Sequence, residues 1–231
     1  MPVQWFAGFE AGDTNELVAL GGAVSVSPLY QRSGNYGGRI VVPPSSSTAY
    51  ITLGSGFDAN GNPTNLSRTA YTLGCGLRLM ALPQSPDTWE YLLYIALSTT
   101  HRASLRLGAD GTLRLHVGVS GAAHLASFGP LELGRWYFCE LAVLADRYVW
   151  RMDGQVVAQG LAAPGGAMNV TYLGKRFNLA SQGYTVDVDD LYTSDDGQLY
   201  GPTTRVVRLS ANANGTAFGW MAYPPEEPPA P

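Results

Sequence analysis

The sequence has little charge, and its basic residues are of almost one kind. Asp, Glu, Lys and Arg make up 14% of the 231 residues, and the formal net charge is −4. Of the 14 basic residues only Lys175 is a lysine. A basic surface tract of the kind that binds phosphate backbones is therefore missing, and we expect no nucleic-acid partner.

Cysteines and long apolar runs are also scarce. The 2 cysteines, Cys75 and Cys139, each lie on the apolar side of an alternating segment. We expect buried free thiols there, with a disulfide across the core as the alternative. No run approaches the roughly 20 apolar residues that span a membrane, so no membrane insertion is expected. The N-terminus lacks a charged start followed by an apolar run, which predicts a soluble protein made without a signal peptide.

Helical periodicity is the third absence. No segment repeats apolar residues at the spacing of an amphipathic helix. Instead, 28 glycines and 15 prolines separate short alternating segments, as in proteins with many strands and tight turns. A hydrophobic fraction of 45% can supply a substantial core. The sequence therefore predicts an all-β protein with about a dozen strands and almost no helix.

The clearest alternating segment runs from Arg135 to Gly160. Its odd-numbered residues from 137 to 143 are apolar, so Glu140 on the other side of the strand is expected to face water. Ala145-Asp146 and Asp153-Gly154 then form turns, and the second pair favours a tight hairpin because both of its residues accept positive φ. Three successive antiparallel strands can bury their apolar face only against another sheet. The segment therefore predicts an antiparallel β-sandwich.

The domain organisation follows from where the alternation ends. We expect one sandwich domain over residues 1–210 and an extended C-terminal segment over residues 211–231. That segment ends in Tyr223–Pro231, a proline-rich tail that cannot enter a sheet interior. The turn-rich insert Gly54–Asn65 is the first place where we expect a binding loop.

Several motifs together resemble the concanavalin A-like (laminin G-like) jelly roll. In chain order they are Gly8-Phe9-Glu10, Ser33-Gly34-Asn35-Tyr36-Gly37, Gly134-Arg135-Trp136-Tyr137 and Met152-Asp153-Gly154. Further on, Val188-Asp189-Asp190-Leu191-Tyr192, then Arg205–Leu209 and a polar run before Trp220, resemble structural proteins of tailed-bacteriophage virions that carry this domain. The resemblance covers most of residues 3–220. It departs from the pattern at Gly201-Pro202-Thr203-Thr204, where many relatives have G-D-V.

The resemblance implies a non-enzymatic structural protein displayed on the capsid or the tail, at the virion surface. Its partners would be other virion proteins and further copies of itself in a closed homo-oligomer. The alternative is a lectin-like, carbohydrate-binding module that recognises a host surface glycan. Tyr36 and Tyr50 lie near loops, where an aromatic ring can meet a sugar or a partner protein. Tyr223, at the start of the proline-rich tail, is a third candidate contact.

The sequence does not support catalysis. Glucanases of this fold carry an E-x-D-x-x-E strand whose alternate carboxylates serve as nucleophile and acid/base. Here the corresponding run is Asp187-Val188-Asp189-Asp190, which has no glutamate. No G-x-S-x-G elbow is present, and the 3 histidines lie on separate predicted strands without a metal-ligand spacing. We expect no enzyme, and we expect Asp189 or Asp190 to hydrogen-bond a neighbouring loop instead.

Calcium is the one cofactor that the sequence suggests. Laminin G-like domains often hold this ion near the rim of the sandwich with carboxylate and carbonyl oxygens. Two groups of residues carry suitable oxygens: Asp187, Asp189 and Asp190 in the acidic run, and Asp58, Asn60 and Asn62 in the insert. The second group lacks the glutamate that closes an EF-hand loop. Solvated turn residues are the alternative for both groups.

Overall fold

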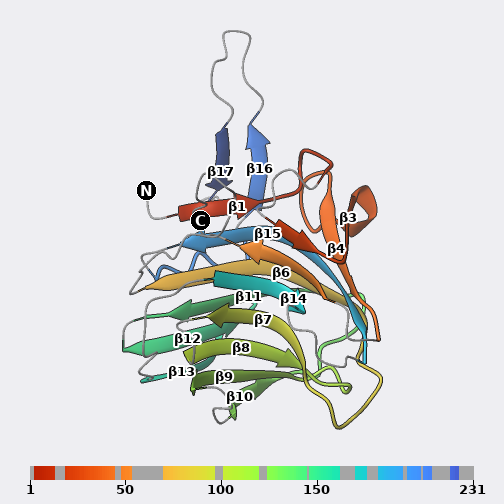
Figure 1. The fold of residues 1–231 in the computed structure, drawn as a ribbon. Coiled ribbons are helices and arrows are strands. Elements are labelled where there is room, and N and C mark those ends of the chain that lie inside the picture. The colour runs from red at the N-terminus through yellow and green to blue at the C-terminus, as the bar shows by residue number, and fades with distance from the viewer. Residues whose placement is uncertain are drawn as a thin grey trace, which may run out of the picture.

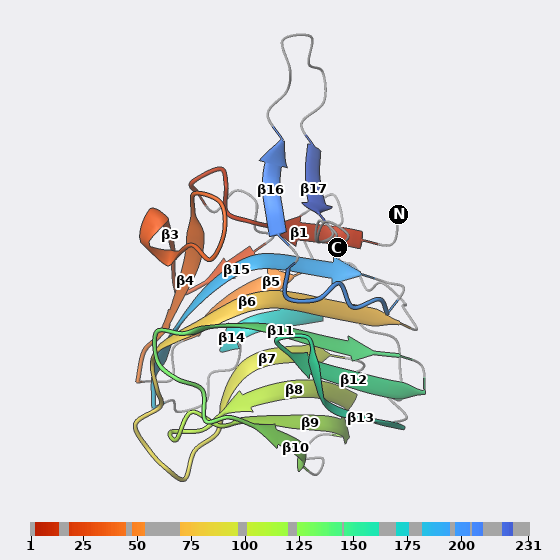
Figure 2. The same cartoon turned by 180° about the vertical axis from the view of Figure 1, so that it is seen from behind.

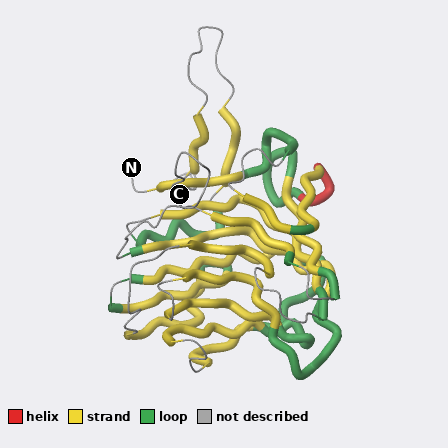
Figure 3. The backbone as a smooth tube through the Cα atoms, viewed as in Figure 1, coloured by secondary structure: helices red, strands yellow, loops and turns green. Residues whose placement is uncertain are grey.

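A computed structural model describes most of the chain. The described residues are 3–13, 19–44, 48–53, 70–96, 101–119, 124–144, 146–161, 170–175, 182–194, 197–203, 205–209 and 219–223. Within them, strands dominate, and the one helical element is η1 (Pro28–Tyr30), a short 3₁₀ turn (Figure 3). No helix in this part of the chain is long and apolar enough to cross a membrane.

Two antiparallel sheets form the body of the protein (Figure 1). The eight-stranded sheet, called sheet A here, has the order β13-β12-β11-β6-β15-β4-β3, and β1 pairs with β15 beside this path. Its strands are β1 (Val3–Ala7), β3 (Ala23–Ser27), β4 (Gly37–Val42), β6 (Tyr71–Ala81), β11 (Trp136–Val143), β12 (Arg147–Met152), β13 (Gln155–Leu161) and β15 (Tyr184–Ser194).

The seven-stranded sheet, called sheet B, has the order β10-β9-β8-β7-β14-β5-β2. Its strands are β2 (Ala19–Gly21), β5 (Ala49–Leu53), β7 (Glu90–Ala96), β8 (His101–Leu107), β9 (Leu113–Val119), β10 (His124–Phe128) and β14 (Val170–Lys175). Neighbours in the sheet are often far apart in the chain, since β14 separates β5 from β7. The predicted all-β antiparallel sandwich is confirmed.

The core lies between the two sheets and is built by alternation. On β6, Leu73, Cys75, Leu77 and Leu79 are at most 1% exposed and belong to one apolar cluster with residues of both sheets. Cys75 and Cys139 lie opposite each other in the register of β6 and β11, and both are free and buried, as the sequence predicts. Burial raises the pKa of the Cys139 thiol to about 12 and that of Cys75 well above its usual value. We therefore expect these thiols to be unreactive and to contribute to the core as small apolar side chains.

A separate two-stranded hairpin stands away from the sandwich (Figures 1 and 2). It consists of β16 (Arg205–Leu209) and β17 (Gly219–Tyr223), which pair with each other from Arg205↔Tyr223 to Leu209↔Gly219. The predicted domain boundary at residue 210 falls between these strands, outside the described residues, and it stays a prediction. The proline-rich tail beyond Tyr223 is also outside them.

Candidate functional site

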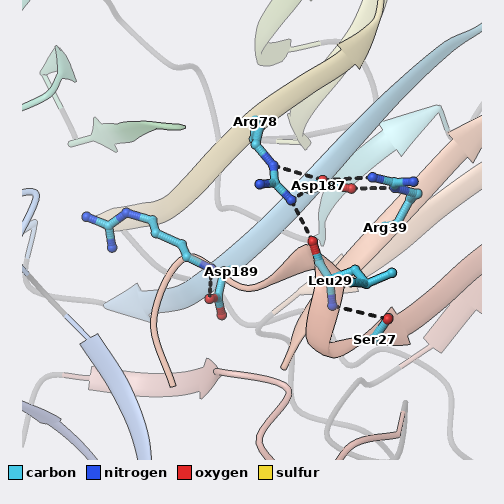
Figure 4. A network of polar contacts seen from close by, with 7 residues as sticks. Ser27, Leu29, Arg39, Arg78, Asp187 and Asp189 are labelled. Atoms are coloured by element: carbon cyan, nitrogen blue, oxygen red, sulfur yellow. Dashed lines mark hydrogen bonds and ion pairs between the residues drawn. The ribbon is translucent and has the colours of Figure 1, made fainter. Parts of the chain in front are cut away.

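The acidic run of β15 lies on the outer face of sheet A and binds arginines. Asp187 is fully buried, and its two carboxylate oxygens accept hydrogen bonds from Arg39 Nε (2.5 Å) and Arg78 Nη2 (2.7 Å) (Figure 4). The same guanidinium of Arg78 also donates to the carbonyl oxygen of Leu29 in η1 (2.9 Å). Asp187 thereby connects three strands and fixes η1 to the sheet, because charge-assisted pairs of this geometry are strong and directional.

Asp189 and Asp190 fix the loop that follows η1. One oxygen of Asp189 accepts hydrogen bonds from the backbone N–H groups of Arg32 (2.7 Å) and Ser33 (3.0 Å). The carboxylate of Asp190 accepts from Arg32 Nη1 (2.6 Å) and from the Ser33 hydroxyl (2.7 Å). Asp190 has a φ of 49°, at a bulge between β15 and β6 that turns its side chain toward the loop. The expectation that these aspartates hydrogen-bond a neighbouring loop is confirmed.

The three aspartates predicted to bind calcium on β15 accept hydrogen bonds from arginines, a serine and backbone N–H groups. Their carboxyl groups do not converge on one site. Asp187 points toward Arg39 and Arg78, whereas Asp189 and Asp190 point toward the loop at residues 32–33. Among the described residues, no three His, Cys, Asp or Glu side chains are grouped as a metal site. The second predicted group, Asp58, Asn60 and Asn62, lies outside the described residues. Calcium binding stays a prediction.

Asp189 makes stability depend on pH. Burial, followed by the charge of Asp190, raises the pKa of the Asp189 carboxyl to about 8, against the opposing effect of the N–H groups of Ser33 and Arg32. An aspartate in an unfolded chain has a pKa of about 3.9. The folded chain binds this proton more tightly, so the stabilisation from Asp189 is complete below pH of about 4 and is lost as pH rises to about 8. We expect the free energy of unfolding, measured with urea at constant ionic strength, to fall across this interval.

Two variants separate Asp189 from other titrating groups. Asp189→Asn removes the proton that titrates, so its unfolding free energy should vary less between pH 4 and 8 than that of the unaltered chain. Asp110 is a matched exposed carboxyl whose pKa is lowered, chiefly by the N–H of Thr112. Asp110→Asn should leave the slope in this interval unchanged because Asp110 titrates below it. An unaltered slope in Asp189→Asn would contradict the assignment.

Glu140 does not face water, and that prediction is wrong. The side chain is fully buried, and its Oε1 accepts hydrogen bonds from the Tyr192 hydroxyl (2.5 Å) and the Gly201 N–H (2.8 Å). The segment at 197–203 crosses the outer face of sheet A and covers this position (Figure 2). Gly201 lies 61 residues beyond Glu140 in the chain, so the alternation within β11 contains no information about this cover.

Two glycines of β6 make room on the same face. Gly74 lies between Glu140 and Tyr192 in the sheet register, and a Cβ at Gly74 would stand 1.9 Å from the Tyr192 ring. At Gly76, a Cβ would stand 2.5 Å from Cδ of Arg32. Because glycine has no side chain, the tyrosine and the arginine can lie flat across the strand and reach their carboxylates. The outer face of sheet A is thus a covered, internally paired structural layer.

The outer face of sheet B is built differently, from aromatic side chains. Four tyrosines of three neighbouring strands follow one another across β5, β14 and β7, and we call them the aromatic row: Tyr50, Tyr172, Tyr94 and Tyr91. Successive ring centroids are 5.5, 6.1 and 5.7 Å apart, and the first and last contacts are edge-to-face. Leu93 and Ile95, on either side of Tyr94, point into the core, which places Tyr94 on the outer face. A register shift between Tyr91 and Leu93 brings Tyr91 to the same face, opposite Arg106.

Arginines and histidines continue this face over β8, β9 and β10. Arg106 on β8 and Arg114 on β9 are directly opposite each other, and their strand neighbours of the opposite parity, all leucines, lie in the core. The guanidinium of Arg106 lies 4.8 Å from the Tyr91 ring, and that of Arg114 lies 3.6 Å from the Trp89 ring. His116 faces His124 with ring centroids 5.9 Å apart. Aromatic faces beside a few polar groups are typical of sites that bind small ligands.

The predicted contact residues lie in different places. Tyr50 belongs to the aromatic row, and Gly21 beneath it leaves room for its ring. Tyr36 is half-buried, packs against the core and covers Gly12. Tyr223 ends β17, and its side chain is outside what the structure describes. Sequence reasoning missed the other three tyrosines and both arginines. Strict alternation would put Tyr91 and Tyr94 on opposite faces, and only the register shift between Tyr91 and Leu93 brings them together. For the other missed residues the outward parity is readable from the sequence, but their adjacency depends on the strand order.

A pocket of about 410 Å³ lies elsewhere, at the edge of sheet A beside β12 and β13. Its lining consists of Leu144, Arg147, Tyr148, Val149, Gln159, Gly160, Leu161 and Gly197. It shares no residue with the aspartate cluster or with the aromatic row, so we do not build a functional site on it.

Comparison with known proteins gives likeness of fold alone. No family model matches the chain, and no curated protein matches its sequence. Among solved structures, Cip1, a cellulose-induced protein, has a TM-score of 0.61 at 13% identity, with 82% of this chain and 96% of that chain covered. Domain 4 of AbnA, an extracellular arabinanase from Geobacillus stearothermophilus solved with arabinotriose, has a TM-score of 0.55 at 16% identity, with 84% and 92% covered.

A third similar structure is larger than this chain. The binding domain of botulinum neurotoxin DC, solved in complex with SialylT, has a TM-score of 0.54 at 9% identity, and 78% of this chain is covered. The aligned part spans 43% of that domain. With sequence identities this low, the likeness shows a shared fold, and what this chain shares with these proteins is the antiparallel, jelly-roll-like β-sandwich.

Proposed function

We propose that this protein is a non-catalytic, carbohydrate-binding β-sandwich and that it binds a glycan on the outer face of sheet B. The observation that carries the proposal is the aromatic row. Three of its members, Tyr50, Tyr91 and Tyr172, are half-buried, so part of each ring faces outward. A row of rings offers flat apolar surfaces, and the hydroxyl groups at their tips are hydrogen-bonding partners for a sugar.

The outer face of sheet A is less suited to bind a glycan than that of sheet B. On the outer face of sheet A, the carboxyl groups of Asp187, Asp189 and Asp190 are already engaged by arginines and backbone N–H groups, and covering segments lie over them. A pair of carboxylates free to act as nucleophile and general acid is absent from the described part of this face, which favours binding over glycoside hydrolysis. Sheet B is therefore the face on which we place the ligand.

The fold neighbours add support from their own ligands. Domain 4 of AbnA was solved with arabinotriose, and the botulinum neurotoxin DC binding domain was solved with SialylT. Each of these two β-sandwiches was therefore solved with a bound molecule, which is arabinotriose in the first and SialylT in the second. At 16% and 9% identity they do not locate the site in this chain, for which the aromatic row is the argument.

Binding of the full chain to a broad glycan panel tests the proposal. We expect saturable binding to at least one glycan, and Tyr172→Ala should weaken it because Tyr172 is at the centre of the aromatic row. Removal of a central aromatic contact typically costs on the order of 2 kcal/mol of binding free energy, roughly thirtyfold in Kd. Repeating the titration after chelation with EDTA tests the calcium prediction, and unchanged binding would remove calcium from the mechanism.

The matched control is Tyr30→Ala on the outer face of sheet A. Tyr30 is also half-buried, and its ring lies 4.0 Å from the guanidinium of Arg39. Its loss should leave Kd within about twofold of the unaltered chain. Thermal unfolding of each variant establishes that it is folded before its binding is compared. Equal losses in both tyrosine variants would argue against a site on sheet B.

Display on a tailed-phage virion is the second candidate, as a structural part at the particle surface held by other virion proteins and by copies of itself. The hairpin of β16 and β17 favours it. Among the described strands, these two pair with each other and with neither sheet of the sandwich. Free strand edges can add a strand from a neighbouring chain. A blank glycan panel from folded protein would leave this role as the better account, whereas a glycan hit is compatible with receptor recognition by a virion.

A further inference from the structure

Two arginines on the outer face of sheet B stand side by side. Arg106 and Arg114, which we call the cationic pair, are direct cross-strand partners in the register of β8 and β9. Like charges in directly opposed positions destabilise a sheet. The chain has a net charge of −4 and only 14 basic residues, so this concentration of positive charge is a local feature of the face.

Aromatic rings hold the cationic pair, and neither arginine forms a direct ion pair among the described residues. Arg114 lies over Trp89, and Arg106 lies over Tyr91 and donates from Nη2 to its hydroxyl (3.2 Å). The Nε atoms of both arginines are buried and lack a hydrogen-bond partner in the described structure. The nearby carboxylate of Asp110 accepts hydrogen bonds from the N–H (2.9 Å) and hydroxyl (2.8 Å) of Thr112, and the charge of Arg114 makes a smaller contribution to lowering its pKa. The rings hold the two guanidinium planes without neutralising them.

The arginines on sheet A, unlike the cationic pair, form direct ion pairs with aspartates. On the outer face of sheet A, Arg32, Arg39 and Arg78 each reach an aspartate oxygen at 2.5–2.7 Å. No ion pair of this kind involves Arg106 or Arg114 among the described residues. Among the described residues, the arginines of sheet B thus lack a directly paired carboxylate, since Asp110 acts on Arg114 only through the longer-range attraction of their charges. An external anion can supply the missing direct pair.

Polar groups extend the cationic pair toward the aromatic row. Ser104 lies opposite Tyr94 and His116 in the register, and its buried hydroxyl has no hydrogen-bond partner within the described structure. The pairs Tyr94↔Ser104 and Tyr91↔Arg106 belong to adjacent positions on the same face. Residues two apart on a strand are about 7 Å apart, so one oligosaccharide can meet the rings and the cationic pair together.

We propose that the outer face of sheet B binds an acidic glycan, whose carboxylate or sulfate group is held by Arg106 and Arg114 while an adjoining sugar ring packs on the aromatic row. The inference rests on the glycan-binding function proposed above and narrows its ligand class. Guanidinium groups bind planar oxyanions through paired hydrogen bonds, which a neutral sugar hydroxyl cannot match.

Calorimetric titration of the full chain with matched glycans tests this assignment. Two pairs of probes differ by a carboxylate: a sialylated oligosaccharide and its desialylated form, and a uronic acid oligosaccharide and the form whose carboxyl groups are reduced to alcohols. The third pair is a sulfated oligosaccharide and its unsulfated form. Each acidic probe that fits should bind at least about tenfold more tightly than its neutral partner, and the advantage should shrink at high salt. The three acidic probes distinguish carboxylate from sulfate as the source of the charge.

The variants are Arg106→Gln and Arg114→Gln, with Arg135→Gln as the control. Arg135 is exposed and pairs with Glu132 at 3.0 Å on a surface loop, so its loss should leave binding unchanged. Each variant of the cationic pair should weaken acidic probes at least about tenfold and change neutral probes less than twofold. Arg114→Lys retains the charge without the planar group and should recover only part of the loss. Thermal unfolding confirms that each variant is folded.

The outcomes separate this inference from the proposed function. If neutral and acidic partners bind equally, or if both glutamine variants bind acidic probes normally, the acidic-glycan assignment is overturned and glycan binding stands. If no glycan binds, both proposals fail. If single-stranded DNA binds as tightly as the best acidic glycan, the face is a general anion binder and the assignment is again overturned.

Discussion

Replacement of Asp187 by alanine is expected to lower the free energy of unfolding by about 3–5 kcal/mol, the typical cost of removing one partner of a buried ion pair. Asp187 is fully buried, whereas Arg39 and Arg78 are 24% and 19% exposed. Without the carboxylate, two guanidinium groups stay close together with no countercharge between them. The link from Arg78 to the carbonyl of Leu29 would also lose its anchor, so η1 should loosen from the sheet. Equilibrium urea unfolding measures the loss.

Glu132→Ala provides the matched control for this ion pair. Glu132 pairs with Arg135 at 3.0 Å, but the two side chains are 69% and 54% exposed. Pairs of this kind contribute about 0–1 kcal/mol because solvent screens the charges. Asp187→Asn adds a second comparison, since it keeps the shape and removes the charge. A loss for Asp187→Ala no larger than that for Glu132→Ala would show that the aspartate does not hold the two strands and η1 together.

Replacement of Gly74 by alanine is expected to cost about 3 kcal/mol of unfolding free energy, although it adds a single methyl group. The new Cβ would stand 1.9 Å from the Tyr192 ring, which is fully buried and stacked near Phe138 with centroids 6.5 Å apart. The ring can yield only by leaving its position. The hydrogen bond from its hydroxyl to Glu140 would then break and leave a buried carboxylate with one partner fewer.

Gly134→Ala separates this steric effect from the backbone effect of any glycine replacement. Gly134 has a φ of 77°, and no atom lies within 4 Å of an added Cβ. Its replacement should cost only the roughly 1–2 kcal/mol of a left-handed conformation. The double variant Gly74→Ala with Tyr192→Ala should lose less than the sum of the single losses, because the second change removes the clash. Additive losses in urea unfolding would refute the proposed contact.

The alternation of apolar and polar residues along the sequence predicted much of the fold. Apolar residues at every second position predicted the long strand β6 and the three-stranded run from β11 to β13, and the pair Asp153-Gly154 predicted the hairpin turn between β12 and β13. Both cysteines were expected on buried positions, and both are there. Such features depend on neighbours two to four residues apart, and for this reason a single sequence contains them.

The candidate site was harder to predict because it depends on which strands are neighbours. Tyr50 and Tyr172 are 122 residues apart in the chain, and they meet because β14 inserts between β5 and β7. The sequence alone placed Tyr50 near a loop and contained no sign that three further tyrosines would line up beside it. Strand order is a property of the whole sheet, and alternation within one strand is compatible with many orders.

The sequence by itself determined that this protein folds as an all-β sandwich, and it determined which side of most strands faces the core. The tertiary structure alone decided what the outward residues do. Glu140 is buried because a segment 61 residues away covers it, and Asp187 is neutralised because β4 and β6 bring arginines to either side. Arg106 and Arg114 lie over aromatic rings, and within the described part of the chain neither forms a direct ion pair with a carboxylate. The physical reason is that burial on an outer face, and the charge of a neighbour, are set by contacts between distant segments, which local periodicity does not encode.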